Sequence, residues 1–98
     1  MTTTKAVRIT TAGGDVTLDG IKEIHGYSIV TDGANNATLK IYNDAAKTDQ
    51  RWEDQCIGSD LVKERSWAAP LKNPTAGTTV LSPSGTGGVF YVRVSGGT

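Results

Sequence analysis

Apolar and polar residues alternate along most of this chain, and this period of two constrains the fold more than any other feature. In an extended strand successive side chains point to opposite faces, so alternation marks a strand with one buried face. A helix would instead repeat its apolar residues every three or four positions. The clearest example is Ala37–Asn43, whose two faces carry Ala37, Leu39 and Ile41, and Thr38, Lys40 and Tyr42.

Runs of this kind recur along the chain, separated by clusters of Gly, Asn, Asp and Ser that are typical of turns. The expected strands are residues 5–10, 16–18, 21–31, 37–43, 51–57, 61–69, 78–82 and 89–94. This spacing predicts an all-β fold, a single small antiparallel β-sandwich or jelly-roll-like barrel of seven to eight short strands. The alternative of a helical turn stays open at Asp44–Gln50, which contains Ala-Ala-Lys.

Three segments refine this prediction. Ile21–Thr31 has apolar residues at both odd and even positions, which is typical of a central strand buried on both faces. The short loop Asp32–Asn36 joins it to Ala37–Asn43, and two strands joined in this way predict a β-hairpin. Residues 70–77 contain two prolines and a glycine and are expected to form a loop.

The chain is long enough for one domain, residues 1–98, but not for two. Residues 1–6 are rich in threonine and could be an N-terminal arm that adds a strand to a neighbouring sheet. Residues 95–98 are expected to be a flexible tail. Because a domain this small buries a modest core, we expect self-association or docking on a larger body to reinforce it.

Charge and hydropathy exclude several classes of partner. Basic and acidic residues are balanced at ten each, and the basic ones are spread along the chain. Nucleic-acid binding would require a basic stripe, so none is expected. The first six residues contain no apolar signal sequence, and no stretch approaches the roughly 20 apolar residues of a membrane span. We therefore expect synthesis in a cytoplasm and no membrane partner.

The chain offers few groups for chemistry. One cysteine and one histidine can form neither an intrachain disulfide nor a zinc site. Cys56 and His25 could formally pair as nucleophile and base, but a buried cysteine and a histidine within a strand are the favoured interpretation. We predict no enzyme, no metal and no cofactor.

Two further motifs have ordinary structural interpretations. A strand follows Gly85–Gly88, whereas a phosphate-binding loop needs a helix there, so these glycines are expected to form a turn. Glu53 and Asp54 are adjacent in a strand and point to opposite faces, which argues against a calcium site that includes Asp49. The loop Asp32–Asn36 is an alternative calcium ligand set, but its residues also suit a turn.

Trp52 and Trp67 are flanked by charged residues, and in so small a domain one of them is expected in the core. If both tryptophans were exposed, they could anchor an interface, because Trp and Arg dominate binding hot spots. Two coplanar exposed rings could instead form a sugar-binding platform. The residues we expect at an interface are Thr2, Thr3, Thr4 and Lys5 of the arm, with Tyr42, Arg51, Trp52, Arg65, Trp67 and Tyr91.

Four segments in order, Ile24–Val30, Ala37–Asp44, Pro70-Leu71 and Ser84–Val94, resemble the small β-sandwich virion proteins of tailed bacteriophages. There a Gly-x-x-(Ile/Val) strand leads to an Ala-Thr-(Leu/Val)-x-(Ile/Leu)-Tyr strand, a Pro-Leu segment and a Gly-Thr-rich turn. The resemblance covers residues 21–94, and its departure is Asp49–Ala69, which has no counterpart in that family.

The resemblance implies a virion structural protein, in particular a capsid decoration or cement protein that binds and stabilises the shell. Such proteins are often homotrimers, so the implied partners are the major capsid protein or another virion protein, and further copies of the chain. A tail, baseplate or head-fibre component is the first alternative. A carbohydrate-binding β-sandwich module is the second.

Overall fold

The computed structural model describes residues 4–72 and 77–96, and in this part of the chain the secondary structure is almost entirely strand. The elements are β1 (Thr4–Thr10), β2 (Val16–Asp19), β3 (Ile21–Val30), β4 (Ala37–Tyr42), β5 (Gln50–Cys56), the short 3-10 helix η1 (Gly58–Asp60), β6 (Val62–Lys72), β7 (Thr78–Gly85) and β8 (Val89–Gly96). The all-β prediction is confirmed.

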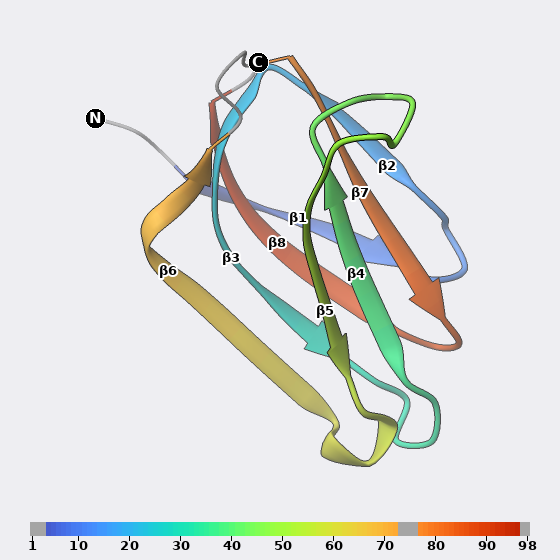
Figure 1. The fold of residues 1–98 in the computed structure, drawn as a ribbon. Helices are drawn as coiled ribbons and strands as arrows, with labels where there is room; N and C mark the ends of the chain where they lie inside the picture. The colour runs from blue at the N-terminus through green and yellow to red at the C-terminus, as the bar shows by residue number, and fades with distance from the viewer. Residues whose placement is uncertain (1–3, 73–76, 97–98) are drawn as a thin grey trace.

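The eight strands form two four-stranded antiparallel sheets, ordered β1-β8-β3-β6 and β2-β7-β4-β5 (Figure 1). The pairs β1·β8, β2·β7, β3·β6 and β4·β5 are those of one long hairpin whose turn lies between β4 and β5. Two further pairs, β3·β8 and β4·β7, complete the sheets as this hairpin rolls up. This strand order is the jelly roll, a form of antiparallel sandwich.

The predicted hairpin between β3 and β4 is wrong, because the two strands lie in different sheets. The loop between them turns the chain across the sandwich, and the Asp32 carboxylate accepts the backbone N–H groups of Ala34 and Asn35, at 2.9 and 2.8 Å. Thr31 Oγ1 donates to the carbonyl of Gly58 at 2.7 Å, which ties the loop to η1. Sequence spacing alone cannot distinguish such an arch from a tight hairpin turn.

In β3, apolar residues occur at both odd and even positions, and the cause is not the predicted burial of both faces of the strand. The pairing with β8 shifts register between Ile21 and Glu23, and again between Ile24 and Gly26. Each extra residue moves the following side chains to the opposite face. Ile21, Ile24 and Tyr27 are therefore all buried in the core although they are three residues apart. The central position predicted for this strand is confirmed.

The chain ends and two connections also differ from expectation. Residues 4–6 of the predicted arm begin β1 and pair with β8, and residues 95–96 of the predicted tail end β8. Residues 70–72 of the predicted loop continue β6. In the segment Asp44–Gln50, residues 44–49 form a turn and not a helix, because the Asp44 carboxylate binds the N–H groups of Thr48 and Asp49, and Gln50 begins β5. Residues 1–3 of the predicted arm, 73–76 of the predicted loop and 97–98 of the predicted tail lie outside the described residues.

One core lies between the sheets, and it contains apolar side chains from both. The residues buried there are Ile9, Ile21, Ile24, Tyr27, Ile29, Ala37, Leu39, Ile41, Cys56, Leu81, Phe90, Val92 and Val94. The alternating residues of β8 behave as predicted, since Phe90, Val92 and Val94 face inward while Tyr91 is exposed.

Gly26 lets three strands meet closely on the outer face of one sheet. The Arg93 side chain of β8 crosses over it and donates to the carbonyl of Arg65 at 3.1 Å and to Ser66 Oγ at 2.9 Å. A Cβ atom at position 26 would lie 2.3 Å from both the Arg65 carbonyl oxygen and the Arg93 guanidinium. Because the first of these is backbone, a larger residue must displace β6.

We predict that Gly26→Ala destabilises the protein by about 2 kcal/mol, in the range expected for overpacking. Ser28→Ala, two residues along the same outer face, is the matched control and should change stability by less than about 0.5 kcal/mol. Urea unfolding followed by tryptophan fluorescence measures both. Equal stability of the two variants would show that the close approach at Gly26 does not constrain β6.

The Asp32 carboxylate gives the β3–β4 loop a pH dependence. Hydrogen bonds from the backbone and side chain of Asn35, and from the backbone of Ala34, lower the pKa of Asp32 to about 2. The ordinary value is 3.8, so the folded state prefers the ionised form. Its contribution to stability is complete above pH 4 and is lost as the pH falls towards 2.

We therefore expect the free energy of unfolding to decrease as the pH is lowered from about 4 to about 2. Asp32→Asn retains an oxygen acceptor but cannot titrate, so its stability should fall less steeply across this interval. Urea titrations at several pH values measure the slopes. If the variant and the parent protein have the same slope, the loop does not contribute to acid unfolding.

Candidate interaction surface at the open side of the sandwich

Strands β5 and β6 are edge strands of opposite sheets and do not pair with each other in a backbone ladder. Both follow the same side of the sandwich, where η1 links them at one end (Figure 1). This side is closed by side chains instead of backbone. We call the group that closes it the β5–β6 seam; its members are Tyr27, Trp52, Asp54, Lys63, Arg65 and Trp67.

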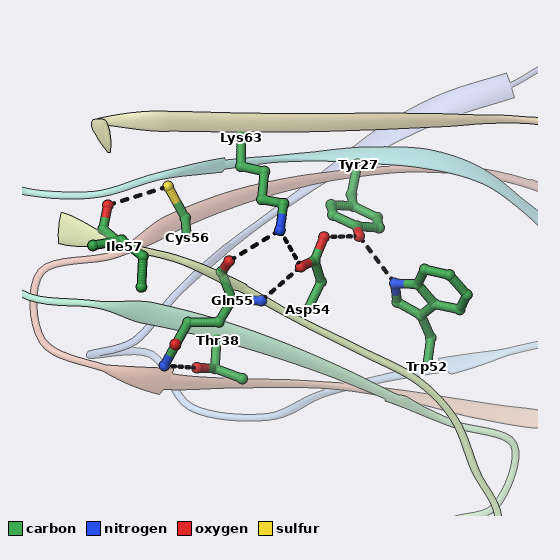
Figure 2. Close-up of polar contacts among 8 residues, drawn as sticks. All are labelled: Tyr27, Thr38, Trp52, Asp54, Gln55, Cys56, Ile57 and Lys63. Atoms are coloured by element: carbon green, nitrogen blue, oxygen red, sulfur yellow. Dashed lines mark hydrogen bonds and ion pairs between the residues drawn. The ribbon is translucent and has the colours of Figure 1, made fainter. Parts of the chain in front are cut away.

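A chain of hydrogen bonds joins the sheets across the seam (Figure 2). Trp52 Nε1 of β5 donates to the hydroxyl of Tyr27 on β3 at 2.9 Å, and this hydroxyl donates to the carboxylate of Asp54 on β5. Lys63 Nζ of β6 binds the other oxygen of Asp54 at 2.7 Å. The Tyr27 hydroxyl thus both donates and accepts, as a buried polar group requires.

These contacts shift the pKa values of two groups in opposite directions. Burial, followed by the hydrogen bond to Asp54, raises the pKa of Tyr27 well above 10. Burial alone would raise the pKa of Asp54, but the hydrogen bonds from Lys63 and Tyr27 outweigh it and lower this pKa overall. At neutral pH the tyrosine is therefore a neutral donor and the aspartate an ionised acceptor.

The aromatic rings of the seam hold one exposed cation. The rings of Trp52 and Trp67 lie 5.0 Å apart at 86°, and Trp67 also packs edge-on against Tyr27 at 5.6 Å. The Arg65 guanidinium lies 4.6 Å from the centre of the Trp52 ring and 5.6 Å from that of Trp67. A cation over an indole face is attracted by the negative potential of the ring.

An irregularity in β6 places Trp67. Ser66 pairs with Gly26 and Leu71 pairs with Ile24, so residues 67–70 of β6 lie opposite the single residue His25 of β3. This insertion interrupts the ladder and bends the strand, as β6 does in its last third in Figure 1. The bend lets the indole of Trp67 pack against Tyr27.

The charges on β6 face the interior side of the sheet. Lys63 and Arg65 are paired with Ile29 and Tyr27, whose side chains are buried in the core. Because β6 lies at the edge, its inward face meets Asp54 and Trp52 of β5 instead of apolar core residues. Charges that point inward on an edge strand also discourage pairing with another sheet.

The structure brings three of the predicted interface residues together, namely Trp52, Arg65 and Trp67. Both tryptophans are half-buried and pack against the core, so neither is a fully buried core residue as was expected for one of them. The residues that sequence reasoning missed in the seam are Tyr27, Asp54 and Lys63. The spacing of Trp52, Asp54 and Cys56 could have indicated Asp54, because alternate residues of a strand share a face.

The other predicted interface residues lie elsewhere. Tyr91 is 39% exposed on the outer face of β8, between Arg8 and Ser28 of the neighbouring strands. Tyr42 is half-buried on β4, and Arg51 is exposed where the β4–β5 register shifts. Thr4 and Lys5 are exposed on β1, whereas Thr2 and Thr3 lie outside the described residues.

The two residues considered for a catalytic pair have different partners. His25 Nε2 is hydrogen-bonded to Ser95 Oγ at 2.7 Å, and the Cys56 thiol donates to the Ile57 carbonyl at 3.6 Å. Burial raises the pKa of Cys56, which disfavours the reactive thiolate. No hydrogen bond between described residues links the two side chains.

Among residues 4–72 and 77–96, no cluster of three His, Cys, Asp or Glu side chains could hold a metal ion. No helix in the same residues is long and apolar enough to cross a membrane.

The rings of Trp52 and Trp67 are nearly perpendicular, which contradicts the coplanar platform that a sugar-binding site at these two residues would need.

Comparison of the chain with models of known protein families, with curated proteins and with solved structures found no match.

We predict that Tyr27→Phe destabilises the protein by about 1–3 kcal/mol, because it removes a partner from both Trp52 Nε1 and Asp54. Tyr91→Phe is the matched control, since the Tyr91 hydroxyl makes no hydrogen bond to any described residue. Its stability should stay within about 0.5 kcal/mol of the parent protein. Urea unfolding measures both variants.

A double-mutant cycle that combines Tyr27→Phe with Asp54→Asn measures the interaction free energy between these two side chains. If Tyr27 and Asp54 act as one unit, the double variant should lose at least about 0.5 kcal/mol less than the sum of the single variants. Additive losses would mean that the two residues stabilise the seam independently.

Proposed function

We propose that this chain is a virion structural protein of a tailed bacteriophage, specifically a capsid decoration or cement protein. It binds the shell through protein–protein contacts centred on the β5–β6 seam. The observation that carries the proposal is the exposed Arg65 stacked on two half-buried tryptophans at the open side of a small sandwich. Trp and Arg are the residues that most often dominate binding hot spots.

The fold is compatible with this proposal but does not by itself favour it. Jelly rolls occur in viral capsid proteins, and also in lectins and cupins, so architecture alone does not select a function. The resemblance of residues 21–94 to small phage virion proteins favours the first of these classes. All seam residues except Tyr27 lie in Asp49–Ala69, the segment where that resemblance departs, which is where contacts specific to one partner would be expected.

The stability of the domain supports docking for a second reason. A partner that binds only the folded state stabilises it by mass action. A domain of 98 residues has a small core, and contact with a shell would add to its stability without chemistry. The proposed partners are the major capsid protein or another virion protein, together with further copies of this chain in a trimer.

A tail, baseplate or head-fibre component would use the same contacts at a different place on the particle. The proposed function therefore predicts a location. In particles purified from the phage that encodes this chain, we expect the protein at a fixed ratio to the major capsid protein, measured by quantitative mass spectrometry. Cryo-electron microscopy should place it on the outer surface of the head.

A deletion mutant provides the control. Particles that lack the chain should lose this density and regain it when the purified protein is added. Density on the tail would replace the decoration role with the tail role. Absence of the chain from purified particles would contradict a structural role in the virion.

A further inference from the structure

Arg65 is an exposed cation that forms no ion pair with any residue the structure describes. Each of the three ion pairs between described residues uses a lysine: Lys63 with Asp54, Lys40 with Glu53 and Lys47 with Asp15. Among described residues, the Arg65 guanidinium donates no hydrogen bond, and its contacts are the faces of two indole rings. Its N–H donors therefore remain available.

The rings that hold Arg65 are themselves fixed. Trp52 is oriented by its hydrogen bond to the Tyr27 hydroxyl, and Trp67 by its edge-on contacts with Tyr27 and Trp52. Stacking on these rings orients the planar guanidinium before a partner arrives. Less side-chain entropy is then lost on binding, so a contact made by Arg65 is stronger than one made by a mobile surface arginine.

We infer that Arg65 is the recognition site for a single carboxylate of a partner protein, an Asp or Glu side chain or a chain terminus. The guanidinium fork would bind both carboxylate oxygens while the tryptophan faces exclude water from one side. This inference deepens the proposed function, on which it rests for the place where the partner is met.

The surroundings of Arg65 favour one carboxylate over a polyanion. Lys63 is already paired with Asp54, and the Arg93 guanidinium is bound to Ser66 Oγ and the Arg65 carbonyl. Glu64, next to Arg65 in sequence, points to the opposite face of the sheet, where its carboxylate accepts from Ser28 Oγ at 3.4 Å. Nucleic acid needs several free cations along a groove, whereas among the described residues of the seam Arg65 is the one cation that is not paired with an acid.

The first test is an NMR titration of the intact protein with a blocked tripeptide, acetyl-Gly-Asp-Gly-amide, and its Asn counterpart. We expect the aspartate peptide to shift the Arg65 Nε–H and both indole N–H resonances saturably. The asparagine peptide should not do so. Equal shifts with both peptides, or larger saturable shifts with inorganic phosphate or an oligonucleotide, would overturn the inference.

Two substitutions distinguish the stacked guanidinium from charge alone. Arg65→Gln should abolish saturable binding of the aspartate peptide, and Arg65→Lys should weaken it at least fivefold, because an ammonium cannot form the planar fork. Arg8→Gln, which removes an exposed arginine of β1, is the matched control and should bind normally. Full binding by Arg65→Lys would contradict the proposed geometry.

Binding to particles that lack the chain is the second readout. Arg65→Gln should reduce the affinity at least tenfold while Arg8→Gln leaves it unchanged, with circular dichroism confirming that both variants fold. If the parent protein binds the tripeptide but not the particles, the virion role fails and the carboxylate site stands. If it binds the particles and Arg65→Gln binds equally well, the carboxylate inference fails alone.

Discussion

The hydroxyl of Tyr27 connects the two sheets on the side where no backbone hydrogen bond does so. It is contributed by a central strand of one sheet, is fully buried, and binds Trp52 and Asp54 on the edge strand of the other. Each sheet must end somewhere, and an open edge leaves backbone groups and core side chains exposed to water. In this protein a polar and aromatic cluster closes that gap, and the geometry of the remaining seam residues follows from it.

The same cluster both closes the fold and carries the proposed binding site. Lys63 neutralises Asp54, so that among the described residues of the seam Arg65 is the cation left without an acidic partner, and the tryptophans that pack beneath Arg65 are held by Tyr27. A surface that is rigid because it closes the core is well suited to recognition, since little order must be gained on contact. The burial that keeps Tyr27 neutral and the hydrogen bonds that keep Asp54 ionised maintain this arrangement at neutral pH.

The positions of the strands follow from the sequence pattern, whereas the pairing of the strands does not. The period of two located β4 and β8 almost to the residue, because the extra residues at the register shifts lie in their partners β5 and β3, so that β4 and β8 keep their own alternation. It misjudged β3, where two register shifts change the parity of the buried residues. It also missed that β3 and β4 belong to different sheets, since a loop of five residues can serve a hairpin or an arch between sheets.

The sequence by itself determined the strand content, the positions of most turns and the alternation that builds one core, because these depend on neighbours along the chain. Only the tertiary structure decided which strands pair, and hence that Tyr27, Asp54 and Arg65 meet although β4 and η1 separate their strands. The physical reason is that rolling the chain into two sheets brings edge strands together across the sandwich. No local pattern records which side chains will close the side between them.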